Sequence, residues 1–453
     1  MGRNPDGMKI FEWAGDVEIV QGDAFDPESL KAAMEGVSAA FYLIHSMAAG
    51  KGFEQRDIAA AENFAQAAKS SGLKRIIYLG GLGKDDPGLS SHLASRHEVG
   101  RILAGSGADV TEFRAAVIVG AGSLSFEMIR YLTERLPLMI CPKWVFTKIQ
   151  PISIDDVLGY LTAAITNEES AGRVIEIGGK DILTYRDLML IYARQRGLKR
   201  FIIRVPVLSP RLSSYWVHLV TPIPSSMAIP LIEGVKNEVV VCDDQAARIF
   251  TDIHPRGYED SVKRALEKLH PDRLSPIRES RFHEGILPHF CIQKEGMIVE
   301  SKTADIEASP EDVFRVVESL GGENGWWGLE RVWYLRGILD RIFGGEGFIS
   351  HRSGRHNAKV GDQIDFLDVE KVVPLEELLL KVRFKLPGAG WMRFKVDAVD
   401  SRKSRLDMTV YFAPKGLRGI AYWYFFLPVH RIVFNIMLKK IKSQASTSAN
   451  GVK

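Results

Sequence analysis

The sequence predicts an α/β fold with a doubly wound parallel sheet, followed by an α+β domain built on an antiparallel sheet. Two observations predict the first domain. Short apolar runs alternate with helical patterns up to about residue 206, and these runs are apolar on both faces. Strands of that kind are typical of parallel sheets that helices cover on both sides. A third observation predicts the second domain, because the later strands alternate apolar with charged residues, as in a sheet with one solvated face.

The elements of the first domain follow from local patterns. Asp26 is a suitable N-cap and Pro27 a suitable first residue for a helix that continues to about residue 35. Crossovers between parallel strands are right-handed, which favours a doubly wound arrangement. We expect further helices over residues 54–69 and 92–103, and strands over residues 17–20, 39–44, 75–79 and 113–119. Residues 208–240 have no clear period, and we interpret them as a cap on the substrate side or an interaction surface.

Local sequence patterns also predict the helices, strands and turns of the second domain. Ser309 and Pro310 predict a helix start. Three alternating strands, 380–386, 392–398 and 406–412, are joined by predicted turns at 387–390 and 400–404. An aromatic helix over about residues 417–440 is the expected cover for their apolar face. The basic side chains on the opposite face are most simply solvated, and an anionic partner is the alternative; they are Lys381, Arg383, Lys385, Arg393 and Lys395.

Composition argues against several classes of protein. The formal net charge is +3, from 59 basic and 56 acidic residues, which does not favour a nucleic-acid partner. The three cysteines lack zinc-ligand or redox spacing, and no signal peptide is visible, so we expect a reducing, cytoplasmic setting. Residues 419–438 are long enough to span a bilayer. They contain His430, Arg431 and Asn435, however, and we expect a buried amphipathic helix instead of a membrane span.

Several stretches resemble the atypical short-chain dehydrogenase/reductases of the NmrA-like group, over roughly residues 3 to 265. They are "VEIVQGDAFDPESL", "FYLIHSM", "RIIYLGGLG", "VTEFRAAVIVG", "QPISIDDV" and "GRVIEIGG". Three further stretches, "GDQIDFLDVE", "KLPGAGWMRF" and "YWYFFLPVHRIVF", resemble an uncharacterised family that is similar to the helix-grip (START/SRPBCC-like) ligand-cavity folds. The resemblance implies an NAD(P)-binding Rossmann-like domain over residues 1–285, a helix-grip domain over residues 290–446 and a flexible tail over residues 447–453.

The start of the sequence departs from the pattern of this family. Domains of this type open with a strand, a Gly-x-x-Gly-x-x-Gly loop and a helix whose N-terminus holds the pyrophosphate. The sequence starts at what resembles the end of the second strand, and the glycine loop is absent. We expect either a start site placed about 30 residues late or a true truncation. Without this loop, the chain is expected to bind NADP or NAD weakly or not at all.

The resemblance implies cofactor contacts residue by residue. Arg3 matches a residue that pairs with an adenosine 2′-phosphate, and Asp23, with Ala24 beside it, matches the adenine position. Ile44, His45 and Ser46 end one predicted strand, and Gly80 and Gly81 end the next. Ligands bind beyond the carboxyl ends of strands in such sheets, so these residues are expected to face the cofactor.

The catalytic pair of the family is missing. In a short-chain dehydrogenase, "SSHLASRHEVGRIL" is where Tyr-x-x-x-Lys is expected, and this chain has His92 and Arg96 there. Arg96 is predicted to keep the ribose contact and to lower the pKa of His92. A neutral His92 could orient a substrate carbonyl, although both residues could equally be ordinary polar residues of a helix face.

Two classes of function follow. The first is an NAD(P)-dependent oxidoreductase acting on a small apolar molecule near His45, His92 and residues 208–240. The second is a regulatory protein that senses NAD(P) or another ligand without turnover. We favour the oxidoreductase, and we leave homo-oligomerisation open.

Overall fold

The structure is a computed structural model in which contacts divide the chain into two units, Met1–Lys268 and Leu269–Lys453. It describes residues 1–47, 50, 52–84, 86, 88–205, 220–276, 289–322, 325–326, 329–342, 344–348, 350, 352 and 357–450. The first unit ends upstream of the expected boundary at residue 285, because residues 269–276 pack against the second unit. Within the expected tail, residues 447–450 continue the last helix.

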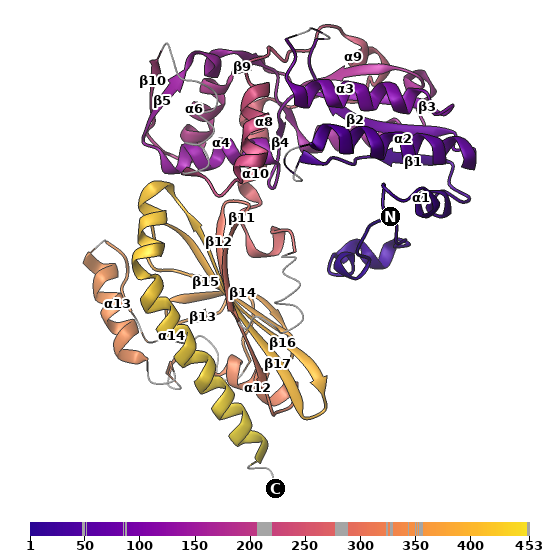
Figure 1. The fold of residues 1–453 in the computed structure, drawn as a ribbon. Coiled ribbons are helices and arrows are strands. Elements are labelled where there is room, and N and C mark those ends of the chain that lie inside the picture. Colours follow the sequence, from indigo (N-terminus) through magenta and orange to yellow (C-terminus); the bar gives the residue numbers. More distant parts are fainter. Residues whose placement is uncertain are drawn as a thin grey trace. The chain divides into compact units, whose positions relative to one another are not determined.

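The first unit is built around a parallel sheet with the strand order β1-β2-β3-β8 (Figure 1). Its strands are β1 (Ala39–Tyr42), β2 (Arg75–Gly81), β3 (Asp109–Ala115) and β8 (Val174–Ile177). The helices packed on it are α1 (Pro27–Ala33), α2 (Phe53–Ser71), α3 (Ser91–Ala104), α5 (Ile154–Ala163) and α9 (Gln245–Ile249).

Both faces of this sheet are covered by helices. Ile76 and Tyr78 of β2 lie in one apolar cluster with residues of α1, α2 and α3. Ile77 points to the other face, where it joins a second cluster with residues of α5 and α9. Successive residues of a strand point to opposite faces, so this division explains the continuous apolar runs of the sequence. The predicted doubly wound fold is confirmed.

The first unit also contains helices and short strand pairs that are not part of the parallel sheet. These helices are α4 (Leu124–Arg135), α6 (Tyr185–Gln195), α8 (Ser225–Gly234) and α10 (Tyr258–Glu267). The strand pairs are β4 (Ile118–Val119) with β7 (Ile152–Ser153), β5 (Leu138–Pro142) with β10 (Phe201–Val205), and β6 (Lys148–Ile149) with β9 (Leu183–Thr184). Of the expected cap, residues 208–219 lie outside the described residues.

Two predicted strands of the first unit are wrong in detail. Residues 17–20 form no strand, because the only pairing there is a parallel bridge between Gly2 and Gln21. Residues 113–119 divide between β3 and β4, which pair with different strands. The helix starts are as predicted: the side chain of Asp26 accepts a hydrogen bond from the backbone of Glu28 at the start of α1.

The second unit is an antiparallel sheet of seven strands in the order β11-β12-β17-β16-β15-β14-β13 (Figure 1). The strands are β11 (His289–Lys294), β12 (Met297–Ile306), β13 (Gln363–Ile364), β14 (Leu367–Val373), β15 (Glu377–Val382), β16 (Gly388–Asp400) and β17 (Lys403–Pro414). Its helices are α12 (Pro310–Glu318), α13 (Glu330–Ile342) and α14 (Gly416–Asn450). The predicted antiparallel sheet is confirmed, while the helix-grip assignment stays a prediction.

The expected strands 380–386, 392–398 and 406–412 correspond to β15, β16 and β17. β15 ends earlier than predicted, at Val382, and β16 begins within the predicted turn, at Gly388. The inner faces of these strands join α12 and α14 in one core that includes Leu380, Phe394 and Met408. No helix in the described part of the chain is long and apolar enough to cross a membrane.

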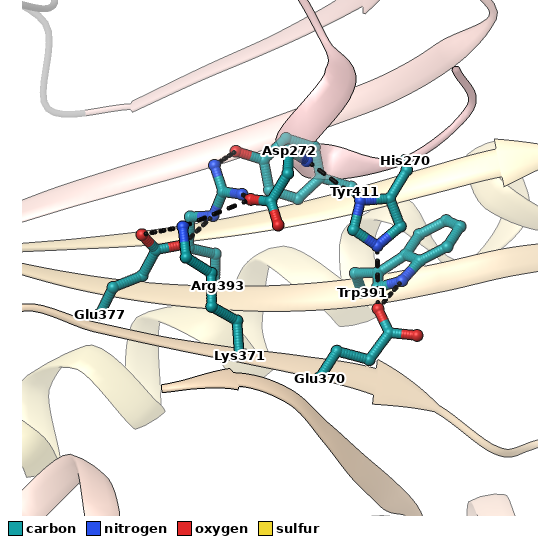
Figure 2. A network of polar contacts seen from close by, with 8 residues as sticks. All are labelled: His270, Asp272, Glu370, Lys371, Glu377, Trp391, Arg393 and Tyr411. Atoms are coloured by element: carbon teal, nitrogen blue, oxygen red, sulfur yellow. Dashed lines mark hydrogen bonds and ion pairs between the residues drawn. The ribbon is translucent and has the colours of Figure 1, made fainter. Parts of the chain in front are cut away.

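The outer face of this sheet is less solvated than the alternation predicts. Residues 269–276 lie against it, and Figure 2 shows the polar contacts that hold them there. The imidazole Nε2 of His270 lies 3.0 Å from Glu370 Oε2, which also accepts a hydrogen bond of 2.9 Å from the indole of Trp391. The guanidinium of Arg393 donates to Asp272 and lies 3.0 Å from Glu377. The prediction of a simply solvated basic face is therefore wrong at Arg393, whose side chain is only 19% exposed.

We expect Arg393→Met to lower the free energy of unfolding of the second unit by about 1–3 kcal/mol, because Asp272 and Glu377 then share one cation, Lys371, instead of two in a partly buried setting. Lys395→Met is the matched control. Lys395 lies on the same strand and face, but its pair with Asp397 is half exposed, so the expected change is below about 0.5 kcal/mol. Urea unfolding of both variants measures the difference, and equal losses would contradict the role given to Arg393.

Candidate functional site

A cavity of about 410 Å³ lies at the carboxyl ends of β1, β2 and β3. Its walls come from these strand ends, from α3, and from α8 and the residues that follow it. Open α/β sheets bind their ligands at this edge, so the cavity is the candidate site.

Five of the residues predicted from the sequence line this cavity: His45, Gly80, Gly81, His92 and Arg96. His45 follows β1 and the two glycines end β2, so these three lie at strand ends as expected, while His92 and Arg96 come from α3.

The other predicted residues do not line it; they are Arg3, Asp23, Ala24, Ile44 and Ser46. Arg3 is exposed, and the carboxylate of Asp23 accepts a hydrogen bond of 3.0 Å from its neighbour Phe25. Their predicted adenine-side roles stay predictions.

Arg96 ties two strand ends together. Its guanidinium donates to the carbonyl of Ile44 at 3.2 Å, beyond β1, and to the carbonyl of Leu79 in β2. The guanidinium also lies 4.9 Å above the ring of Tyr78, whose hydroxyl donates to the Arg96 carbonyl at 2.9 Å. Arginine carries five N–H donors, so the predicted ribose contact would have to use the donors that these two carbonyls do not occupy.

The two histidines of the cavity are neighbours. The rings of His45 and His92 lie 5.4 Å apart. Burial, together with the nearby His45 and Arg96, lowers the pKa of His92 to about 3. Burial and Arg96 also lower the pKa of His45, against the opposing effect of Asp57. Both imidazoles are therefore neutral at pH 7, as predicted for His92.

The Nδ1 atom of His92 is buried and has no hydrogen-bond partner among the described residues. The Nδ1 atom of His45, in contrast, accepts a hydrogen bond of 3.0 Å from the backbone of Met47. A buried polar atom without a hydrogen-bond partner destabilises the fold. A ligand that formed a hydrogen bond with His92 would remove this cost.

The glycines at the end of β2 are explained by packing. A Cβ atom on Gly81 would lie 2.6 Å from the Leu93 side chain of α3. On Gly80 it would lie 3.2 Å from the Tyr78 ring and 3.3 Å from the Glu112 carboxylate. Gly81 therefore allows α3 to approach the sheet closely, and Gly80 fits beside the side chains of β2 and β3.

Sequence reasoning missed two polar residues of the site, Tyr185 and Ser125. Tyr185 is the first residue of α6 and lines the cavity together with Ser125 of α4. Burial raises the pKa of its phenol, so it stays protonated. The helix start at Thr184 is visible in the sequence as a capping box with Asp187, but nothing local indicates that this turn faces residues near position 92.

The predicted cap contributes an apolar wall. Leu231 and Gly234 of α8, and Val239 after it, line the same cavity as His45 and His92. The described part of residues 208–240 therefore lies where a substrate-side cap was expected.

A nicotinamide nucleotide is the cofactor that the resemblance implies, and its ribose end fits this cavity. A nicotinamide ribose in this cavity would lie beside His92, Arg96 and the two glycines that end β2, all of which line it. The described residues contain no group of histidine, cysteine and carboxylate side chains that could hold a metal ion.

Comparison with known families gives two matches. Residues 1–124 match a family described as NAD(P)H-binding. Residues 295–437 match a family described as protein of unknown function (DUF2867). No curated protein matches the chain.

Solved structures resemble the chain over little more than half of its length. An NADPH-dependent quinone oxidoreductase from Escherichia coli is 22% identical, with a TM-score of 0.46, and covers 58% of this chain and 88% of its own. A triphenylmethane reductase from Citrobacter sp. is 20% identical, with a TM-score of 0.45 and the same coverage. A nucleoside-diphosphate-sugar epimerase from Staphylococcus aureus is 20% identical, with a TM-score of 0.45, and covers 58% and 89%. The first unit therefore combines a doubly wound parallel sheet with an N-terminal segment, residues 1–124, that matches an NAD(P)H-binding family.

We expect the stability of the first unit to fall in acid because of His92. Its folded pKa of about 3 lies below the usual value near 6.5. Between these values the unfolded chain binds a proton that the folded chain does not, so stability decreases as the pH falls.

In the unaltered chain the free energy of unfolding decreases between pH 7.5 and pH 5, and His92→Leu should make this decrease about 1–2 kcal/mol smaller. Chemical denaturation at both pH values measures it, with the exposed His254→Gln as control. An acid-induced loss as large in His92→Leu as in the unaltered chain would contradict the burial of a neutral ring.

Proposed function

We propose that the first unit is an NAD(P)-dependent oxidoreductase of the atypical short-chain type, and that it reduces a small, conjugated, apolar molecule. One observation carries the proposal: the cavity at the strand ends combines an apolar wall from α8 with a neutral, unpartnered imidazole at His92. The match of residues 1–124 to an NAD(P)H-binding family supports the cofactor.

The cofactor, when bound, would supply a hydride. The chain's own residues would bind and orient the acceptor. An N–H of the neutral His92 ring would donate a hydrogen bond to an oxygen of the substrate. Arg96, which is buried and permanently charged, would stabilise negative charge that develops nearby.

The acid–base character of the site favours conjugated substrates. An imidazole with a pKa of about 3 is not protonated at pH 7 and cannot deliver a proton efficiently to an alkoxide. The phenol of Tyr185 has a raised pKa and is also a weak acid. A quinone or a similar acceptor spreads the incoming electron pair over a conjugated system and can take its proton from solvent later, whereas a simple ketone needs an acid at once.

The same observation supports an alternative from a different class. A site without an effective acid suits a protein that binds NAD(P) or an apolar ligand and signals its presence without turnover. The alternative predicts cofactor binding with no oxidation by any acceptor.

We expect the chain to oxidise NADPH, supplied at millimolar concentration, with 1,4-naphthoquinone but not measurably with cyclohexanone. His92→Leu should lower kcat/KM about tenfold through the lost hydrogen bond, while His254→Gln should leave it unchanged. The rate should show no inflection between pH 5.5 and 8, because His92 does not titrate there. NADPH binding without oxidation by any quinone would favour the sensing alternative, and an inflection near pH 6.5 that His92→Leu removes would contradict the assigned neutral role.

A further inference from the structure

The first unit carries an exposed apolar surface on the two-stranded parallel sheet that β5 and β10 form, and Figure 1 shows these strands side by side. Four of their side chains are at least half exposed: Leu138 (52%), Ile140 (60%), Phe201 (66%) and Ile203 (50%). We propose that this surface, the β5–β10 face, docks on the surface of an anionic lipid bilayer. The inference does not depend on the redox function proposed for the same unit.

The four side chains form one face. In the parallel register Phe201 pairs with Leu138, and Ile203 pairs with Ile140. Alternate residues of a strand point to opposite sides, and Met139, between the two exposed residues of β5, is only 3% exposed. A sheet face in contact with water normally carries polar residues. Apolar residues on both sides are the pattern of a strand that is covered on both faces, yet the outer side of β5 is exposed.

Basic residues flank this face, and acidic residues are missing from the segments that carry it. Residues 135–148 and 196–205 contain three and four basic residues, respectively, and no aspartate or glutamate. Lys143 directly follows β5, and Lys199 lies two residues before β10, so a cation lies at each end of the face. Both lysines are exposed, and neither forms an ion pair with another described residue. The β5–β10 face is therefore complementary to a surface that is apolar and negatively charged.

A second copy of the chain fits this face poorly. In a dimer with two-fold symmetry the same surface patch meets itself. Lys143 and Lys199 would then lie near the same lysines of the other copy, and the segments that carry the face offer no carboxylate to compensate them. Four apolar side chains are also few for a protein partner, because a standard interface uses about 20–30 residues on each side.

A bilayer surface requires neither a matching shape nor a large contact. Apolar side chains enter the boundary between the headgroups and the acyl chains, and the strength of binding depends on the apolar area buried there and on the attraction of basic residues to anionic lipids. Both contributions are present on the β5–β10 face. We therefore expect peripheral binding that requires the apolar side chains and the lysines together.

Cosedimentation of the full chain with lipid vesicles tests the proposal. We expect at least tenfold tighter binding to vesicles of equal parts phosphatidylcholine and phosphatidylglycerol than to vesicles of phosphatidylcholine alone, because each basic residue near an anionic surface strengthens binding about fivefold. Raising the salt from 0.1 M to 1 M should remove most of this difference, since the screening length falls from about 10 Å to about 3 Å. No binding to the mixed vesicles, or equal binding to both kinds, would overturn the proposal.

Substitution of apolar residues locates the docking surface. Ile140→Thr combined with Phe201→Thr retains residues that favour strands and should weaken binding to the mixed vesicles at least tenfold, because it removes most of the apolar area that enters the lipid. Leu158→Thr combined with Ile165→Thr is the matched control, since these residues are 52% and 42% exposed in or beside α5. The control should bind as the unaltered chain does, and equal binding by the two variants would mean that the chain reaches the lipid through another surface.

Substitution of lysines tests the charge separately and does not alter the strands. Lys143→Gln combined with Lys199→Gln should weaken binding to the mixed vesicles at least tenfold. Lys69→Gln combined with Lys180→Gln removes the same charge from exposed positions elsewhere and should change binding about twofold or less. Equal losses in the two lysine variants would overturn the proposed role of the face. So would a dimer in size-exclusion chromatography that Ile140→Thr with Phe201→Thr converts to a monomer without loss of vesicle binding, because the face would then join two copies of the chain.

Discussion

The contact of Arg96 with two strand ends determines the geometry of the candidate site. The carbonyls of Ile44 and Leu79 lie at neighbouring strand ends, where they accept hydrogen bonds from one buried guanidinium. This fixes the backbone that follows each strand, and with it His45 and the two glycines. His92 precedes Arg96 by four residues, so both project from the same side of α3. A single cation thus positions the site, and it adds to the effect of burial, which lowers the pKa of both imidazoles.

In the second unit, both faces of the sheet are covered, each by a different kind of contact. The inner face packs against α12 and α14 through apolar side chains. The outer face carries the charged network around Arg393, through which residues 269–276 are attached. This explains why the second unit begins at Leu269, before its first strand. It also explains why a charged row on a strand does not imply a solvated face, since the charges can be neutralised by a segment from another part of the chain.

Local signals in the sequence were sufficient to predict many helices and strands and part of the candidate site. The caps Asp26 and Ser309 and the strand ends at His45 and Gly80 could be predicted, because each depends on a few adjacent residues and a general rule. Residues 17–20 look like a strand but lack a strand to pair with, and pairing is not a local property. The apolar run 113–119 gives no sign that it changes partners in the middle. Tyr185 was missed for the same reason, because its place in the cavity depends on how α6 packs.

The candidate site and a second cavity, which lies between α13, α14 and the inner face of the sheet in the second unit, share one physical arrangement. Each combines an apolar wall with a histidine whose Nδ1 is buried and unpartnered and whose pKa is lowered by burial and by an arginine, Arg96 in one case and Arg336 in the other. The two arginines differ in their partners. Arg96 donates to two backbone carbonyls, which satisfy hydrogen bonds without neutralising its charge, whereas Arg336 lies 3.9 Å from the carboxylate of Asp340. Removing an ion from water is costly unless an opposite charge compensates it, so a ligand that carries or develops negative charge is better accommodated beside Arg96 than beside Arg336.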